Sequence, residues 1–555
     1  MCPPNEDVKD EDVESAKTTS VCPPKVRRVL VAGVVGLIVG ALVAGLLAGF
    51  NGYWKGKGEC VKDPSANCPF SKAAVAADSE KCSQIGRDIL QKGGSAVDAA
   101  IAALLCTSII NPQCAGIGGG VIFTVMDSSG KVKIINSRET VPRNVNSDLL
   151  KLCPKTTDWI GVPGEIRGYE AAHRLYGKLN WTDLFQPTIK LAREGFPVPY
   201  VQGQHIPRLN NTSIRELYLD KNGTLLKTGD TVKFEKLADT LETIANESAN
   251  AFYNGTIARD LIIDIQKAGG NLTLEDLASY EAEVTDAWNI SLGEYQILIL
   301  NIMKGYKMNS EPKTTDEKIL FYHRYIEALK FANELKTNIN DPNFSSDEMA
   351  MNLTEDSFAD NKRSLISSDK TRDPGINLYL DSHGTTHVSV LAADGSAVSV
   401  TSSINDEFGS KILSPSTGII LNNQLTDFCG RANSFSPGER PPSNMAPSVL
   451  KSQSKTLVIG GSGSEMIPPA VASVLMNHLW FGKSLKEAID TPVVHVDSQN
   501  EVKPEPKLEK DVVDGLEAKG HKIAKFYNTV NAVEKAGSHI CAWSDERKKG
   551  KAAGY

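Results

Sequence analysis

The chain contains few of the sequence features that mark metal, nucleotide or nucleic-acid sites. No CxxC pair and no group of histidines and cysteines has metal-site spacing, so we predict no metal. The run Gly116–Gly120 lacks the GxGxxG order and the preceding strand of a dinucleotide fingerprint, and close backbone packing is the favoured interpretation. No long basic stripe runs through the body, and the net charge of −7 gives no support for a nucleic-acid partner. We expect no cofactor.

One uncharged run stands out near the N-terminus. Residues 1–28 form a polar, acid-rich tail that ends in a short basic cluster, and Val29 to Phe50 then carries no charge over 22 residues. That length spans a bilayer as a helix and exceeds the apolar region of a cleaved signal peptide. Because the positive charge lies on its N-terminal side, we expect a cytoplasmic tail (1–28), a transmembrane signal anchor (29–50) and a stalk (51–72). The protein would be a single-pass type II protein of the cell membrane with its body outside.

Cysteines and glycosylation sequons agree with an extracellular body. Eight of the ten cysteines follow the apolar run, and an oxidising compartment favours their pairing. A Cys82–Cys106 bridge is the first prediction and a Cys60–Cys68 bridge the second. The sequons all follow the run and precede Thr385; they begin at Asn180, Asn210, Asn211, Asn222, Asn246, Asn254, Asn271, Asn289, Asn343 and Asn352.

Strand and helix patterns are mixed along the body. Ser95 predicts a helix cap, Val121–Val125 predicts a strand, and the pattern from Trp181 to about Asn340 is mostly helical. Strands on both sides of Thr385, with apolar helices to cover them, indicate two stacked sheets between helical layers. The other predicted elements are a flexible connector over 355–382, strands around 419–421 and 456–459, and a helix over 469–481.

The most informative candidate for a nucleophile is Thr385. It follows a glycine and opens a strand of alternating apolar and polar residues, which an Asp394-Gly395 turn joins to a second strand over 397–405. Cleavage before Thr385 would leave a hydroxyl and a free α-amine on one residue. The amine has an unperturbed pKa of roughly 7.7–8, so it can act as a base near neutral pH. Thr-rich hairpins are common, so the rest of the chain decides between a nucleophile and an ordinary hairpin.

Several segments in order along the chain match one family. They are 82–88 (CSQIGRD), 94–103 (GSAVDAAIAA), 116–120 (GIGGG), 162–169 (VPGEIRGY), 251–255 (AFYNG), 384–387 (GTTH), 421–423 (LNN) with 427–428 (DF), and 544–555 (SDERKKGKAAGY). On these segments the chain from about Ala73 to Tyr555 resembles the γ-glutamyltransferase (γ-glutamyl transpeptidase) family, in its animal, membrane-anchored type.

The resemblance implies an α/β fold, the four-layer αββα sandwich of N-terminal-nucleophile hydrolases, preceded here by one transmembrane helix. It also implies autocleavage between Gly384 and Thr385 into a large subunit, whose body is 73–384, and a small catalytic subunit, 385–555. The two subunits would stay together as a heterodimer. The implied reaction transfers a γ-glutamyl group from glutathione or its conjugates to an amino acid, a dipeptide or water.

The resemblance also implies the site residues. Thr385 would attack the γ-carbonyl with Ser403 facing it across the hairpin, since counting back from the turn pairs the two to within a residue. Backbone N–H groups of Gly463 and Ser464 would stabilise the oxyanion. Arg138 matches the arginine that grips the substrate carboxylate with two bonds. The remaining matches are Asn405, Gln424 and Asp427, which would hold the α-ammonium, and Ser443 with Asn444 on the carboxylate side.

The chain departs from the family at three places. The family usually has two serines where this chain has Ser443-Asn444. The oxyanion turn normally reads Gly-Gly, and Ser464 costs energy if that position needs a positive φ. A segment that family members carry after Gln296 is missing, which could reshape the acceptor side or disturb folding.

These departures leave two alternatives to the active transferase. One is a catalytically weak or inactive cell-surface glycoprotein on the same fold, although Thr385, Arg138, Asn405 and Asp427 are all present. The other is an amidase of the same fold that acts on other acyl groups. Arg138 with Asp427 argues against the amidase, because that pair specifies an amino-acid head group.

Overall fold

The computed structural model describes residues 68–145, 149–153, 159–210, 212–287, 294–308, 310–335, 341–344, 352–372, 384–430, 434–524 and 529–555. The expected tail and the expected anchor over 29–50 lie outside these residues. None of the helices within the described ranges is long and apolar enough to cross a membrane.

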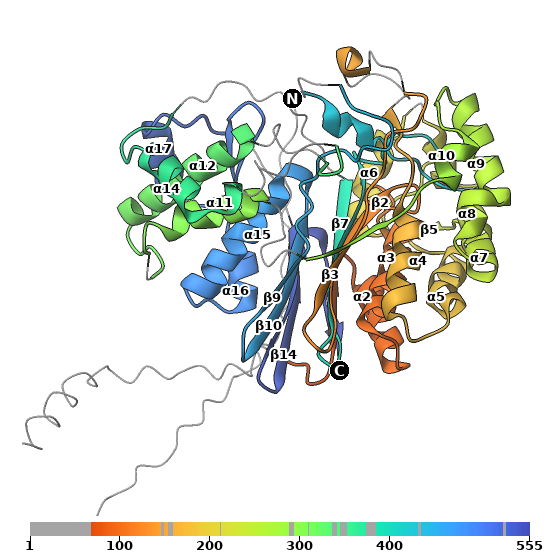
Figure 1. The fold of residues 1–555 in the computed structure, drawn as a ribbon, viewed down its shortest axis with the longest axis horizontal. Coiled ribbons are helices and arrows are strands. Elements are labelled where there is room, and N and C mark those ends of the chain that lie inside the picture. Colours follow the sequence, from red (N-terminus) through yellow and green to blue (C-terminus); the bar gives the residue numbers. More distant parts are fainter. Residues whose placement is uncertain are drawn as a thin grey trace, which may run out of the picture. The chain divides into compact units, whose positions relative to one another are not determined.

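Two antiparallel sheets stack face to face at the centre of the body (Figure 1). In spatial order, the first contains β15 (Ala553–Gly554), β1 (Ala74–Ala77), β7 (Gly384–Leu391), β8 (Ala397–Asn405), β2 (Gly120–Met126), β3 (Val132–Ser137) and β6 (Glu283–Asp286). The second contains β14 (His539–Ser544), β13 (Thr529–Ala536), β10 (Lys455–Ser462) and β9 (Ser448–Lys451). Two short pairs lie elsewhere: β4 (Phe196–Pro197) with β5 (Thr231–Val232), and β11 (Val494–Val496) with β12 (Val502–Pro504).

Helices cover the outer face of each sheet, which makes four layers (Figure 1). Over the first sheet and beyond it lie α2 (Glu80–Gln91), α3 (Ala96–Ile110), α4 (Glu165–Tyr176), α5 (Trp181–Glu194), α6 (Tyr200–His205), α7 (Glu235–Glu247), α8 (Asn250–Asn254), α9 (Thr256–Lys267) and α10 (Leu274–Ala278). On the side of the second sheet lie α11 (Glu294–Lys304), α12 (Thr315–Leu335), α14 (Asp356–Ser364), α15 (Ile467–Leu475), α16 (Leu485–Asp490) and α17 (Lys510–Ala518).

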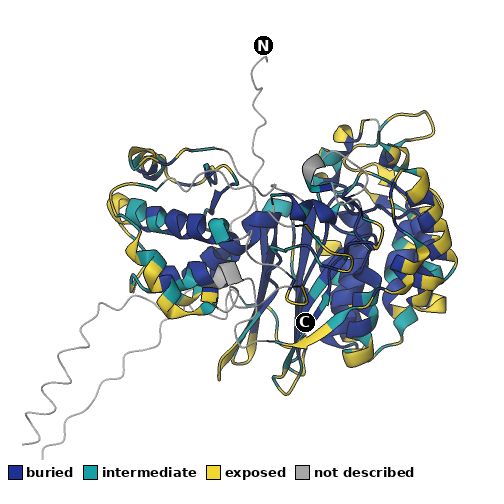
Figure 2. Ribbon diagram, turned by 45° about the horizontal axis from the view of Figure 1, so that its top comes forward, coloured by how far each residue is buried: buried dark blue, intermediate teal, exposed yellow. Residues whose placement is uncertain are grey.

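The alternating sequence of β7 sends its side chains to opposite faces of the sheet. Val388 and Val390 pack into the core under the helices, whereas Leu391 joins the core between the two sheets. Ser389 also faces the second sheet, where its Oγ donates a hydrogen bond to the Asn531 carbonyl at 3.2 Å. Because Thr385 shares this alternate face, it lies at the end of the inter-sheet layer. Every residue of β7 is buried, and the strands form the dark centre of Figure 2.

Several predicted elements are confirmed. Ser95 caps α3 in a capping box with Asp98, and the predicted strand 121–125 lies within β2. The Gly116–Gly120 run does pack backbone against backbone: a Cβ on Gly118 would lie 2.2 Å from the Ile420 carbonyl oxygen. Two predictions are wrong. Part of the supposed connector 355–382 forms α14, and residues 419–421 make only an isolated bridge between Leu413 and Ile420.

The disulfides only partly follow the sequence prediction. Cys82 is bonded to Cys106, as predicted. The Cys60–Cys68 prediction is wrong, because Cys68 is bonded to Cys541 of β14. A third bridge, Cys153–Cys429, was not predicted. The cysteines of these two bridges are 473 and 276 residues apart in the sequence, and only the folded structure brings such pairs together.

Candidate active site

Thr385 lies at the start of β7 with its hydroxyl against Ser403 of β8. The register pairs these two residues, and their Oγ1 and Oγ atoms are 3.2 Å apart. Ser403 Oγ also donates a hydrogen bond of 2.6 Å to the carbonyl oxygen of Gly384. One serine hydroxyl therefore contacts both the threonine hydroxyl and the carbonyl of the peptide bond that precedes it. A Cβ on Gly384 would lie 2.4 Å from the Asp406 carbonyl oxygen, so only glycine fits there.

A partly buried ammonium group, that of Lys548, holds the backbone of Thr385. Lys548 Nζ donates to the Thr385 carbonyl at 2.9 Å and to Ser462 Oγ at 2.7 Å, and it forms an ion pair with Asp78 at 2.9 Å. Asp78 also accepts a hydrogen bond from Thr386 Oγ1 at 3.0 Å. Lys548 and Asp78 are not among the residues predicted from the sequence, although each lies in or beside a segment that carries the resemblance: Asp78 just before 82–88 and Lys548 within 544–555.

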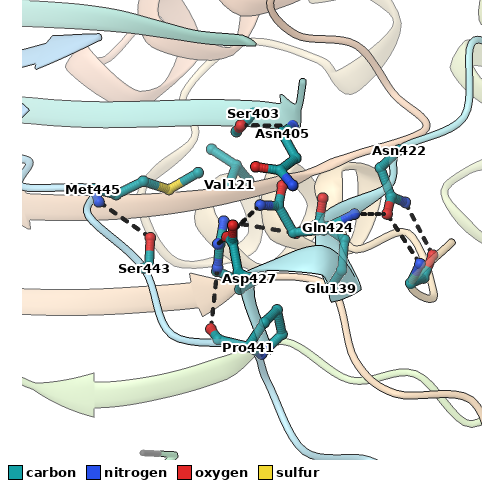
Figure 3. Close-up of polar contacts among 12 residues, drawn as sticks. Val121, Glu139, Ser403, Asn405, Asn422, Gln424, Asp427, Pro441, Ser443 and Met445 are labelled. Atoms are coloured by element: carbon teal, nitrogen blue, oxygen red, sulfur yellow. Dashed lines mark hydrogen bonds and ion pairs between the residues drawn. The ribbon is translucent and has the colours of Figure 1, made fainter. Parts of the chain in front are cut away.

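Arg138 and Asp427 form the charged centre of the site, and Figure 3 shows Asp427 beside Gln424. Arg138 lies just after β3, and Asp427 lies in the short turn η7 (Gln424–Phe428). The Arg138 guanidinium pairs with Asp427 and also donates to the carbonyl of Pro442 at 2.9 Å. Gln424 Nε2 donates to the same Asp427 carboxylate at 2.8 Å. A zwitterion could replace both partners of this ion pair, because its carboxylate fits Arg138 and its ammonium fits Asp427.

Asparagines fix the backbone around this centre. Asn405 Nδ2 donates to Thr426 Oγ1 at 2.6 Å, which connects the end of β8 to η7. Asn422 donates to the Gly118 and Gly161 carbonyls, at 2.8 and 2.9 Å, and its own side-chain oxygen accepts from the Gly161 N–H at 3.0 Å. These bonds lock the turn that carries Gln424 and Asp427, and Figure 3 shows Asn405, Asn422 and Gln424 around it.

The turn after β10 has the positive φ angles at which a serine in place of glycine costs energy. Gly463 has φ +120° and Ser464 has φ +53°. Both values lie in the region that favours glycine, so Ser464 is strained by about 1 kcal/mol. The turn still presents backbone N–H groups at the start of the short helical turn Ser464–Met466.

An open pocket brings the candidate residues together. It is lined by Arg138, Thr385, Ser403, Asn405, Gln424, Asp427, Ser443, Asn444 and Ser464, together with Met445 and Ile467. Of the ten predicted residues, Gly463 alone is not part of the lining, and it adjoins Ser464. The Ser443 hydroxyl accepts a hydrogen bond from the Met445 N–H at 3.1 Å, which shapes the loop at one edge.

Burial controls the ionisation of two groups near the pocket. Glu139 follows Arg138 and is fully buried, and this burial raises its pKa to about 8 even though Arg138 lowers it in part. Burial also holds the pKa of His387 near 3, so its ring is neutral at physiological pH. Glu139 is therefore largely protonated near neutral pH, and Asp427 is the carboxylate that faces the pocket.

Among the described residues, His323, Glu327 and His521 form one group that could hold a metal ion, with ligand atoms within 4.8 Å of one another. All three already have protein partners. His323 Nδ1 lies 2.8 Å from His521 Nε2, and Glu327 accepts a hydrogen bond from Thr371 Oγ1 at 2.5 Å. None of the three lines the pocket around Thr385. The absence of a metal stays a prediction.

Comparisons with a family model and with known proteins point to one family. The family model described as gamma-glutamyltranspeptidase matches residues 82–555. "Glutathione hydrolase 5 proenzyme" of Mus musculus is 44% identical, and the match covers 88% of this chain and 93% of that protein. The Homo sapiens protein of the same name is 42% identical with the same coverage.

A solved structure shows the same fold. Cephalosporin acylase from Bacillus halodurans matches with a TM-score of 0.76 at 24% identity, covering 90% of this chain and 99% of that one. At this identity the likeness concerns the mixed α/β fold alone.

Proposed function

The chain belongs to the γ-glutamyltranspeptidase family, and from this membership we propose that it hydrolyses glutathione and transfers its γ-glutamyl group to amino acids or dipeptides. The relatives that match it over 93% of their length are named glutathione hydrolases and proenzymes. The observation that carries the mechanism is the pocket in which Thr385 faces Ser403 beside the Arg138–Asp427 pair.

The first step is self-cleavage between Gly384 and Thr385. The Thr385 hydroxyl attacks the Gly384 carbonyl carbon, the C–N bond breaks, and the acyl group passes from nitrogen to oxygen. Water then hydrolyses the ester and leaves a free α-amine on Thr385. The hydrogen bond of 2.6 Å from Ser403 to the Gly384 oxygen supports this step, because it polarises the carbonyl that is attacked.

The second step is acyl transfer. The free α-amine accepts the hydroxyl proton of Thr385, and Oγ1 attacks the γ-carbonyl of the donor. Backbone N–H groups of Gly463 and Ser464 hold the negative oxygen, and the cysteinylglycine amine leaves with a proton. Water or the amine of an acceptor then attacks the γ-glutamyl ester and restores Thr385. Ser403 aligns the nucleophile through the contact of 3.2 Å.

The site recognises the α-amino-acid end of the γ-glutamyl group through its two opposite charges. Arg138 binds the α-carboxylate and Asp427 binds the α-ammonium, assisted by Gln424, Asn405 and the Ser443–Asn444 edge. Because both partners are already paired with each other, the substrate exchanges one ion pair for two and leaves no buried charge unpaired. A simple acyl amide, without a zwitterionic end, would have to break the pair without replacing it.

Turnover of glutathione by the full chain tests the proposal. Expressed in animal cells, the protein should release glutamate from glutathione and form γ-glutamyl dipeptides when glycylglycine is added. Thr385→Ala should remove both activities. Ser396→Ala is the matched control, because it removes a hydroxyl at the far turn of the same hairpin, where Oγ bonds only Asp394 in the described contacts. A wild-type chain that folds but neither releases glutamate nor forms γ-glutamyl dipeptides would favour the inactive cell-surface glycoprotein.

We further propose that residues 29–50 anchor the protein as a type II membrane protein and that its outer body is glycosylated. Eight of the ten sequon asparagines lie in described ranges, and each of them is exposed. Three disulfides connect described cysteines, which fits an oxidising compartment. Intact cells should lose the body to added protease, and peptide N-glycosidase should increase its gel mobility; protection of the body in intact cells would overturn this topology.

A further inference from the structure

Two of the three described disulfides cross the proposed cleavage point. Cys68 and Cys153 precede Gly384, and their partners Cys541 and Cys429 follow Thr385. The third bridge, Cys82–Cys106, joins two residues that both precede the cleavage point. Cleavage of one peptide bond would therefore leave the two subunits covalently connected at two places.

The Cys153–Cys429 bridge lies at the end of η7, the turn that carries Asp427 of the head-group site. Cys429 ends the η7 turn that carries Asp427, and its N–H donates to the Thr426 carbonyl at 2.9 Å. On the other side, Cys153 follows the short turn η2 (Leu149–Leu152) of the large subunit. Asp427 is thus two residues from a covalent attachment to the other subunit.

Among the described residues, an apolar cluster also joins this part of the large subunit to η7. Leu149 and Trp159 share a buried cluster with Leu425, Phe428 and Cys429. Apolar contacts give affinity without a fixed register, whereas a disulfide fixes the separation of two backbone positions. The head-group site depends on such a fixed separation, because Arg138 belongs to the large subunit and Asp427 to the small one.

We propose that the mature enzyme is a disulfide-linked heterodimer, and that Cys153 and Cys429 are positioning residues that hold Asp427 opposite Arg138, so that reduction of this bridge weakens binding of the γ-glutamyl donor. The inference rests on the self-cleavage proposed above. Reduction adds two electrons and two protons to the bridge and yields two thiols; a dithiol such as dithiothreitol supplies both and becomes a cyclic disulfide. Cys153 is partly exposed, so a reductant can reach it.

Electrophoresis in SDS tests the covalent connection. Full-length protein whose free thiols are blocked with N-ethylmaleimide should run as one species without reductant and as two with it. Either Cys153→Ser/Cys429→Ser or Cys68→Ser/Cys541→Ser should still give one species, because one bridge remains. Removing both pairs should give two species without reductant. Two species from the unreduced wild type would overturn the inference.

The same gel separates this inference from the cleavage on which it rests. A chain that stays whole after reduction contradicts self-cleavage. In that case, mass spectrometry of an unreduced digest decides the bridges themselves: peptides linked through Cys153–Cys429 and Cys68–Cys541 support the connectivity, and their absence refutes it.

Kinetics tests the positioning role. Cys153→Ser/Cys429→Ser should raise the KM for the γ-glutamyl donor roughly three- to tenfold and change kcat less than about twofold, because the head group is bound equally in ground and transition states. The matched control, Cys68→Ser/Cys541→Ser, lies at β14 and should leave both constants unchanged. Should the first variant fail to fold, dithiothreitol added to folded wild type should produce the same rise in KM. An unchanged KM after verified reduction of Cys153–Cys429 would overturn the positioning role.

Discussion

We propose that charge pairing at Asp427 decides which acyl compounds the site accepts. The carboxylate is held by Arg138 and by a 2.8 Å hydrogen bond from Gln424, so its position is fixed before a substrate arrives. The resemblance to one family could predict Arg138 and Asp427 as site residues. It could not predict their direct pairing, since 289 residues separate them.

Asp427→Asn should reduce discrimination for an α-ammonium group. A hydrogen bond to a charged group contributes about 1.5–3 kcal/mol, so kcat/KM for a γ-glutamyl anilide should fall about 10- to 100-fold. The glutaryl anilide lacks the ammonium and serves as the control substrate, and its slow turnover should not fall, because Asp427 no longer competes with the substrate carboxylate for Arg138. An equal loss for both anilides would show that Asp427 supports the fold rather than the ammonium.

The raised pKa of Glu139 predicts a contribution to the free energy of unfolding that decreases as the pH rises. Burial raises its pKa from 4.5 to about 8, so the folded state binds a proton more tightly than the unfolded state does. The resulting stabilisation is complete below about pH 4.5 and is lost as the pH rises towards 8. Glu165, whose pKa is also raised to about 8 by burial, adds a second contribution with the same sign.

Glu139→Gln should flatten this dependence. The amide has nearly the same shape and no charge, so the unfolding temperature should fall less between pH 5 and pH 8 than it does in the wild type. Glu165 remains and preserves part of the slope. Thermal unfolding of both proteins across this pH range measures the difference, and parallel curves would contradict the raised pKa.

At the scale of the element, sequence patterns predicted the strand pairing and the helix start that depend on contacts between residues close together in the chain. The β7–β8 hairpin has the predicted register because the Asp394-Gly395 turn fixes it, and α3 begins at its predicted cap. The prediction failed for α14, where charged residues form a helix that packs against α11 and α12. Tertiary contacts decide whether such a segment forms a helix, and the local sequence does not show those contacts.

The turn after β10 shows a conflict between local preference and function. Ser464→Gly should stabilise the protein by about 1 kcal/mol, because glycine adopts φ +53° without strain. Activity should be retained, since the backbone N–H keeps its direction. Gly463→Ala is the contrasting variant: at φ +120° a Cβ is strongly disfavoured, so both stability and kcat should fall. Thermal unfolding and glutathione turnover measure both effects, and a less stable Ser464→Gly variant would contradict this account.

At the scale of the whole molecule, the two proposed subunits share one sheet. Strand β1 of the large subunit lies between β7 and β15 of the small subunit, and β2 of the large subunit pairs with β8. The subunits cannot part without breaking backbone ladders, so they should elute together on size exclusion even after reduction. Sequence patterns predicted the two stacked sheets but not this interleaving, because strands 74–77 and 384–391 are paired by the fold and not by proximity in the chain.

The central claim is that Thr385 becomes an N-terminal nucleophile, and N-terminal sequencing tests it most directly. The full chain should be purified, reduced and separated by electrophoresis, and the smaller fragment sequenced. We expect a fragment that begins Thr385-Thr386-His387. A single uncleaved chain, or a fragment that begins at any other residue, would contradict it.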